Sequence, residues 1–227
     1  MCGRISLFAD VETIASRFEV AVDTSVPRRY NVAPGEWLTV VTGDRPATLS
    51  RLTWGLVPHW ADEPDSGPRP INARRETVDE AAPFRDPYRH RRCLVIIDGY
   101  YEWAKTPYGK EPYRFERRDR EPFALAGVWD HWETDDESLE TVAILTADAV
   151  DSVADVHDRM PVILSPEHER RWLNQAPADP TTHELDPAWT DSFHHYQIGV
   201  RINDPTNDDP TVIEPFNGDQ QPTLTDF

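Results

Sequence analysis

The second residue of the chain is a cysteine, in the opening stretch MCGR. Because a small second residue lets the initiator methionine be removed, Cys2 can become the first residue and carry a free α-amine beside its thiol. Reference pKa values of roughly 7.7–8.0 for the amine and about 8.5 for the thiol leave both groups partly nucleophilic near neutral pH. This pair predicts attack on an electrophilic carbon. The alternative interpretation is a small, buried side chain.

Two other stretches, DGYYEW and VHDRMP, contain side chains that could move protons. Glu102 follows two tyrosines and precedes Trp103, so burial among these rings would raise its pKa and make it a general acid near neutral pH. The alternative is an outward-facing carboxylate at a strand end. His157 is followed by Asp158 and Arg159, a setting suited to proton transfer, although a lone histidine in a loop is often only solvated.

The stretch INARRET contains an asparagine and an arginine two residues apart, Asn72 and Arg74. If the segment is extended, both side chains share one face. The asparagine could then hold a terminal amine while the arginine meets an anion. An ordinary turn asparagine is the alternative.

The stretch WGLVPHW contains two tryptophans with different expected roles. Trp54 is expected in the core. Trp60 follows a proline and precedes an acidic loop, so we expect it to be exposed and able to stack on a nucleobase.

The elements that must position these residues are mostly strands. A helix is predicted over DVETIASRF, with Asp10 as its N-cap, and a second over SPEHERRWLN. The predicted strands are EWLTVV, SRLTWGLV, RCLVIIDGYYEW, PYRFERR, PFALAGVWDHW, TVAILTAD and HHYQIGVRI. Because strands and helices do not alternate, the pattern predicts an α+β fold: a curved, mainly antiparallel β-sheet or open barrel with a few flanking helices.

Length and composition limit the class of protein. The 227 residues fit a single domain, 1–227, in which 204–227 form an extended C-terminal tail anchored by VIEPF. No run approaches the roughly eighteen apolar residues of a membrane span, and the first twenty residues lack a signal-peptide pattern, so a cytoplasmic protein with no membrane contact is expected. The two cysteines, Cys2 and Cys93, are too few for a disulfide framework or a cysteine zinc site; Cys93 is expected in a buried strand, and no metal or cofactor is expected.

The formal net charge is −18, from 41 acidic and 23 basic residues, and only Lys105 and Lys110 are lysines. This composition resembles that of proteins from extreme halophiles, whose acidic surfaces stay hydrated in concentrated salt. The total charge disfavours nucleic acid, yet local arginine clusters could still bind phosphate.

Seven stretches, in order and over nearly the whole chain, resemble the SOS-response-associated peptidase (SRAP) family. They are MCGR, RYNVAPGE, WGLVPHWA, INARRET, RCLVIIDGYYEW, PFALAGVW and VHDRMPVIL, and INDPTNDDPTVIEP is similar to the family's terminal segment. The acidic surface and the loop around residues 174–190 fall outside the resemblance.

The resemblance implies a covalent DNA-repair chemistry. Cys2, exposed by self-directed removal of Met1, would attack the aldehyde of a ring-opened abasic site in single-stranded DNA and close a thiazolidine, with lyase activity as a further possibility. Only an N-terminal cysteine offers both nucleophiles on one residue. Catalytic roles would fall to Asn72, which would position the amine, and to Glu102 and His157, which would handle protons.

The resemblance also implies a DNA-binding surface on a monomer. Phosphates flanking the lesion would be held by arginines expected to converge around Cys2, namely Arg4, Arg74 and Arg159. Pro34 and Trp60 match family positions that pack on neighbouring bases.

Two other functions remain open from the sequence. A glutamine amidotransferase of the N-terminal-nucleophile class also begins Met-Cys-Gly, but the NG segment expected for its oxyanion hole occurs only as FNG in the tail. A non-covalent reader of modified or single-stranded DNA would make Cys2 incidental.

Overall fold

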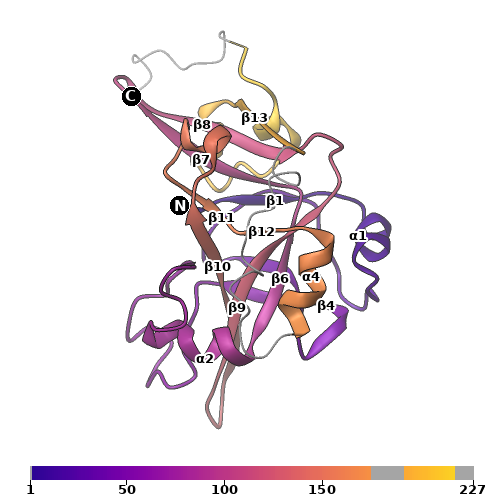
Figure 1. The fold of residues 1–227 in the computed structure, drawn as a ribbon, viewed down its shortest axis with the longest axis vertical. Helices are drawn as coiled ribbons and strands as arrows, with labels where there is room; N and C mark the ends of the chain where they lie inside the picture. Colours follow the sequence, from indigo (N-terminus) through magenta and orange to yellow (C-terminus); the bar gives the residue numbers. More distant parts are fainter. Residues whose placement is uncertain (1, 175–191, 218–227) are drawn as a thin grey trace.

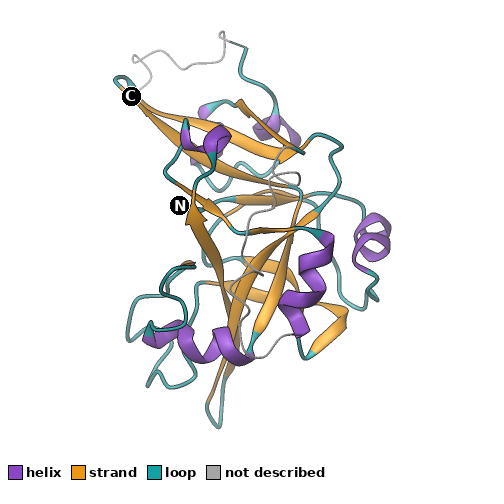
Figure 2. Cartoon of the chain, viewed as in Figure 1, coloured by secondary structure: helices purple, strands orange, loops and turns teal. Residues whose placement is uncertain are grey.

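The computed structural model describes residues 2–174 and 192–217. Strands make up most of the body, in two sheets one above the other, and the longer helices lie along the outside of the larger sheet (Figures 1 and 2). The predicted α+β class with a curved, mainly antiparallel sheet or barrel is therefore confirmed. Among the described residues no helix is both long enough and apolar enough to cross a membrane.

The smaller sheet contains the start of the chain. Its order is β13-β8-β7-β1-β2, and every neighbouring pair is antiparallel. The bounds are β1 Ile5–Leu7, β2 Arg29–Val32, β7 Gly99–Thr106, β8 Gly109–Arg117 and β13 Phe193–Gln197. Because β1 lies between β7 and β2, the N-terminal segment is an integral part of the fold.

The larger sheet closes into a barrel because β10 pairs with both β4 and β9 along the ring β10-β4-β3-β6-β9. Only the β4–β10 and β5–β10 pairs are parallel. The bounds are β3 Trp37–Thr42, β4 Arg45–Trp54, β5 Asn72–Arg74, β6 Arg92–Ile97, β9 Phe123–Glu133, β10 Ser138–Asp148, β11 Arg159–Pro161 and β12 Ile163–Leu164.

Successive side chains of a strand point to opposite faces of the sheet, and this alternation separates two apolar clusters. One cluster contains Cys2 together with Leu38 and Leu52 of the barrel. The other contains Ile14 and Trp172, from the helices that cover the barrel's outer face. Cys93 is fully buried in β6, as expected.

Both predicted helices are present, as α1 (Val11–Phe18) and α4 (Pro166–Asn174). Asp10 precedes α1 with extended backbone, but its side chain makes no cap hydrogen bond and instead pairs with Arg28. Two helices were not predicted, α2 (Ala82–His90) and the short α3 (Asp151–Ala154). Pro87 inside α2 disfavours a helix locally, and burial of Phe84 and Tyr88 on one face compensates.

Three predicted strands are wrong in extent. SRLTWGLV begins and ends too late, because β4 covers Arg45–Trp54. RCLVIIDGYYEW is not one strand but two: the chain leaves the barrel after β6, turns at Asp98, and enters the smaller sheet as β7. HHYQIGVRI stops being a strand after Gln197, and Val200–Asn203 forms a 3-10 helix. The unpredicted strands β1, β2, β5, β11 and β12 are too short for a period-two pattern, so pairing with distant strands defines them.

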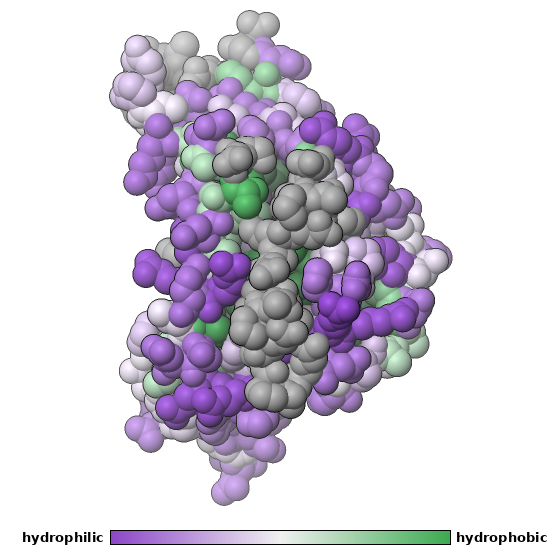
Figure 3. Space-filling model, viewed as in Figure 1, coloured by the Kyte–Doolittle hydropathy of each residue, from purple (hydrophilic) through white to green (hydrophobic). Residues whose placement is uncertain are grey.

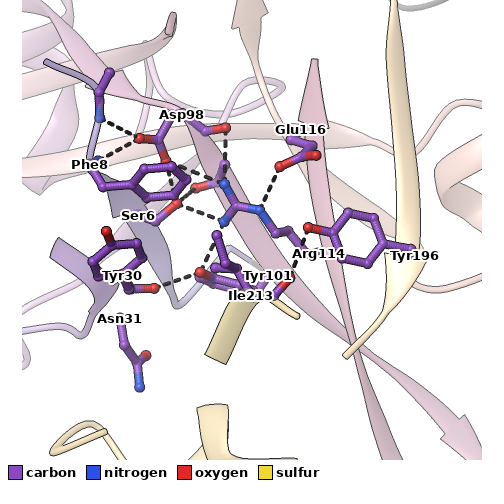
Figure 4. A network of polar contacts seen from close by, with 12 residues as sticks. Ser6, Phe8, Tyr30, Asn31, Asp98, Tyr101, Arg114, Glu116, Tyr196 and Ile213 are labelled. Carbon is purple, nitrogen blue, oxygen red and sulfur yellow. Dashed lines mark hydrogen bonds and ion pairs between the residues drawn. The ribbon is translucent and has the colours of Figure 1, made fainter. Parts of the chain in front are cut away.

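A buried ion cluster joins β1, β7 and β8 (Figure 4). The fully buried guanidinium of Arg114 donates to Glu116 at 2.8 Å, to Ser6 Oγ at 2.8 Å and to the Tyr101 hydroxyl at 2.9 Å. Asp98 Oδ1 lies 3.4 Å from the same guanidinium. Because losing one partner would leave a buried charge uncompensated, the cluster fixes these strands relative to one another.

The described part of the predicted tail, residues 204–217, packs against β2. Asp208 Oδ1 accepts from the backbone N–H of Asn31 at 2.9 Å, and Asn31 Nδ2 donates to the Asn207 carbonyl at 2.8 Å. Val212, in the 3-10 helix Pro210–Ile213, is buried. The remainder, 218–227, lies outside the described residues.

We expect Gly99→Ala to lower the free energy of unfolding by about 1–3 kcal/mol, the usual cost of overpacking. A Cβ at this position would lie 2.4 Å from Cζ of Arg114, which cannot move without losing its buried partners. Gly67→Ala is the matched control, because a Cβ there meets nothing within 4 Å. Urea unfolding measures both variants, and equal stabilities would contradict this account.

Candidate functional site

Cys2 lies at the junction of the two sheets and is fully buried. Its carbonyl accepts a hydrogen bond from Asn72 Nδ2 at 2.7 Å, and β1 begins three residues later and pairs with β7. Burial raises the pKa of the thiol, and the neighbouring Glu102 carboxylate adds to this effect. The thiol therefore stays protonated until a nearby group accepts its proton.

Glu102 lies on β7 with its side chain directed into this junction. The residue is 2% exposed, so the outward-facing alternative is wrong. Burial is the main cause that raises its pKa from 4.5 to about 7. Near neutral pH the carboxyl group is therefore present in both acid and base forms.

His157 follows α3 and approaches the same carboxylate. Its Nε2 lies 4.0 Å from Glu102 Oε2, while Nδ1 lies 3.0 Å from the backbone N–H of Arg159 and 2.9 Å from Asp158 Oδ1. The backbone N–H suits the neutral ring, and the aspartate suits the protonated ring. Partial burial lowers the pKa of His157 and favours the neutral form. The histidine therefore lies in the site rather than free in solvent.

Asn72 begins the short strand β5, which pairs with β10. The segment is extended, so the turn alternative is wrong: Ala73 points into the core, and the flanking Asn72 and Arg74 lie on the opposite face. The indole N–H of Trp54 donates to the Ile71 carbonyl at 2.9 Å and fixes the approach to the strand. Asn72 Oδ1 is a buried acceptor without a hydrogen-bond partner among the described residues.

The three candidate phosphate-binding arginines differ in their surroundings. Arg4 donates to Asn31 Oδ1 at 2.6 Å and to the Ile202 carbonyl at 2.8 Å, and burial lowers its pKa. Arg159 pairs with Glu76 at 3.0 Å and Asp148 at 2.6 Å.

Arg74 is exposed and has no ion pair within the described part of the chain. Its partner in the β5–β10 register is Thr146. The strand β11, which begins at Arg159, pairs with the same end of β10. The two carboxylates around Arg159 offset its charge, so Arg74 provides the most accessible positive charge of the three.

Pro34 and Trp60 are both exposed, on separate turns. Trp60 is 59% exposed, whereas Trp54 is buried as expected. The Pro34 turn is tied to Trp54, whose carbonyl accepts from the backbone N–H of Gly35 at 2.8 Å. Both turns therefore offer exposed apolar surface, and the Pro34 turn is held by a buried core residue.

Tyr100 is the site residue that the sequence interpretation missed. It is buried beside Cys2, and burial, followed by the charges of Cys2 and Glu102, raises its pKa. Its ring stacks on Phe115 at 4.8 Å. The sequence did contain a signal for Tyr100: it lies two residues before Glu102 on a strand, and residues two apart on a strand share a face.

Within residues 2–174 and 192–217, no cluster of three or more His, Cys, Asp or Glu side chains could hold a metal ion.

A family model described as SOS response associated peptidase (SRAP) matches residues 1–205. The chain belongs to this family. The abasic site processing protein YoqW of Bacillus subtilis is 37% identical over 224 residues, covering 94% of this chain and 99% of the relative. The abasic site processing protein YedK of Escherichia coli is 29% identical over 226 residues, covering 95% and 100%. A crystal structure of a Bacteroides thetaiotaomicron protein superposes with a TM-score of 0.84 at 28% identity, covering 95% of this chain and all of that one.

The raised pKa of Glu102 predicts a pH-dependent stability. Between pH 4.5 and about 7 the folded protein retains a proton that the unfolded chain has released, so this group makes the free energy of unfolding fall as pH rises. The slope from one group is at most about 1.4 kcal/mol per pH unit. Glu102→Gln stays neutral, so its stability relative to the native protein should increase from pH 5 to pH 8 in urea unfolding. A constant difference would contradict the raised pKa.

Proposed function

We propose that this protein processes abasic sites in DNA by covalent capture through Cys2, once Met1 has been removed. The observation that carries the proposal is the convergence of Asn72, Glu102 and His157 on an N-terminal cysteine. Relatives that span nearly the whole chain are named abasic site processing proteins, which supports abasic-site DNA as the substrate class. Single-stranded DNA is the proposed form of that substrate, and a cytoplasmic monomer is the proposed state of the protein.

The proposed reaction joins Cys2 to the aldehyde of a ring-opened abasic sugar. The α-amine adds to the aldehyde carbon, and loss of one water gives an imine. The sulfur then adds to the imine carbon, while the thiol proton passes to the nitrogen. The product is a five-membered thiazolidine, and both nucleophiles must come from the same residue.

The residues around Cys2 suit the proton transfers of this reaction. As an acid, Glu102 can protonate the sugar ring oxygen during opening and the hydroxyl that leaves as water. As a base, it can accept the thiol proton, which the buried thiol does not release unaided. His157 Nε2, on the other side of the carboxylate, can exchange protons with the sugar hydroxyl or the imine nitrogen.

Asn72 is suited to orient the α-amine. Its Nδ2 holds the Cys2 carbonyl, and its buried Oδ1 is available to accept from the amine. The word peptidase in the family name fits a self-directed cleavage that removes Met1, and we propose no activity on other proteins. A lyase reaction would follow if the imine led to strand cleavage before the sulfur closed the ring.

The exposed groups near the site would hold the DNA strand. We assign phosphate contacts to Arg4, Arg74 and Arg159, with Arg74 contributing most because it is the most exposed of the three. Pro34 and Trp60 would pack on the bases that flank the lesion. We take the acidic composition as an adaptation to concentrated salt, which weakens phosphate contacts and leaves retention to stacking and the covalent bond.

Cys2→Ala should abolish a denaturant-stable adduct with single-stranded abasic DNA, and Cys2→Ser should do so nearly as fully, because an oxygen nucleophile does not replace the thiol. A denaturing gel measures the adduct, and intact mass measures Met1 removal. Glu102→Gln should slow adduct formation by about 10²-fold or more. Adduct formation by Cys2→Ala at the native rate, or glutamine hydrolysis in place of adduct formation, would refute the proposal.

Arg74→Ala should weaken non-covalent binding of single-stranded DNA and reduce the slope of log K against log salt by about 0.7. Arg170→Ala is the matched control, because Arg170 lies on α4 and pairs with Glu19 at 2.8 Å. Fluorescence anisotropy across potassium chloride concentrations measures both slopes. Adduct yield should persist into multimolar salt while the protein stays folded, and a collapse of yield would contradict the assigned adaptation.

A further inference from the structure

Trp60 is an exposed aromatic residue on a turn whose backbone is anchored on both sides. The N–H of His59 donates to Asp130 Oδ2 at 2.9 Å, and the carbonyl of Ala61 accepts from Trp132 Nε1 at 2.8 Å. The N–H of Ala61 closes the turn onto the Pro58 carbonyl at 3.0 Å. Both anchoring side chains come from β9, so the exposed ring stands on a rigid base.

Asp130 is the centre of this anchor. Its side chain is only 1% exposed, yet two backbone N–H groups, a guanidinium and an imidazole nitrogen surround the carboxylate. Oδ2 accepts from the backbone N–H of His59 and lies 3.0 Å from His59 Nδ1. Oδ1 accepts from the backbone N–H of His131 at 2.9 Å and forms an ion pair with Arg91 at 3.0 Å, and the same Arg91 nitrogen lies 3.2 Å from His59 Nδ1. A carboxylate satisfied in this way holds the turn, the end of α2 and β9 in one arrangement.

The surface beside Trp60 is shaped for a flat apolar group. A cavity of about 470 Å³ borders the ring, and its walls include Pro58, Pro64, Pro83 and Phe84. The exposed carboxylates of Asp62 and Glu63 lie at the same cavity and disfavour a phosphate there. A nucleobase, which is uncharged and stacks on aromatic faces, is the part of a DNA strand that matches this lining.

We propose that Asp130 is a positioning residue for DNA binding. Acting through His59, and together with Trp132, it holds Trp60 in one orientation, so that a base flanking the abasic site stacks without further ordering of the protein. Ordering a mobile side chain on binding costs conformational entropy, and a preformed platform avoids that cost. The inference rests on the proposed function, because it takes abasic-site DNA as the ligand.

A double-mutant cycle tests whether Asp130 acts through Trp60. The ligand is a single-stranded oligonucleotide with a tetrahydrofuran residue in place of the abasic sugar, which has no aldehyde and cannot react with Cys2. Trp60→Ala should weaken its binding by about 5- to 150-fold, the equivalent of one lost stacking contact. Asp130→Asn, which turns an amide N–H toward existing donors, should weaken binding at least about threefold, and should have no further effect when Trp60 is already alanine.

Trp132→Phe provides an independent second variant, because it removes the N–H donor to Ala61 while keeping an apolar ring at a buried position. It should behave like Asp130→Asn, and it decides the question if Asp130→Asn does not fold in thermal unfolding. Asp98→Asn is the matched control: it disrupts a different buried carboxylate, in the Arg114 cluster, and any effect on binding should be the same in both Trp60 backgrounds.

The proposal is overturned if folded Asp130→Asn or Trp132→Phe binds the oligonucleotide as tightly as the native protein does. It is also overturned if either substitution weakens binding as much in the Trp60→Ala variant as it does in the native protein. Crosslinking to an oligonucleotide with a true abasic site is measured in parallel. Failure of the native protein to crosslink would refute the covalent function. The double-mutant cycle would still test the role of Asp130, because it measures non-covalent binding to the unreactive ligand.

Discussion

The buried guanidinium of Arg114 is the constraint on which the arrangement of the smaller sheet depends. A charge removed from water must be met by partners of fixed geometry, and these partners come from β1, the turn at Asp98, β7 and β8 (Figure 4). The cluster therefore sets where β1 lies against β7. Because Cys2 lies three residues before β1 and Glu102 lies on β7, the same cluster helps to fix the thiol and the carboxyl group relative to each other.

Burial gives the site its chemistry. In water at neutral pH, a glutamate side chain is a carboxylate, and a cysteine thiol with a pKa of about 8.5 is partly ionised. At the junction of the two sheets, the charged forms of both groups are disfavoured, so Glu102 can exchange protons near neutral pH and Cys2 remains a thiol until it reacts. Asn72 can orient an amine there without adding charge. The site thus places a thiol that stays protonated beside a carboxyl group that exchanges protons near neutral pH.

The surface of the protein combines a strong negative charge with a few accessible cations. Hydrophilic residues dominate the face seen in Figure 3. Many arginines are held by carboxylates, as with Arg17 and Glu169 or Arg159 and Glu76, and such pairs contribute little to the attraction of DNA. Contacts that do not depend on charge, such as stacking on an anchored tryptophan, are correspondingly more valuable on such a surface.

The sequence by itself determined the fold class, the two helices α1 and α4, most of the long strands and the residue types of the candidate site, because hydrophobic periodicity and side-chain chemistry are local properties. Tertiary structure decided the rest. The break at Asp98 between two sheets and the helix containing Pro87 depend on partners distant in sequence. The burial of Glu102, the extension of Asn72 and the neutralisation of Arg159 likewise arise from groups on other strands. A residue's pKa and accessible charge depend on what surrounds it, and only the folded chain supplies those surroundings.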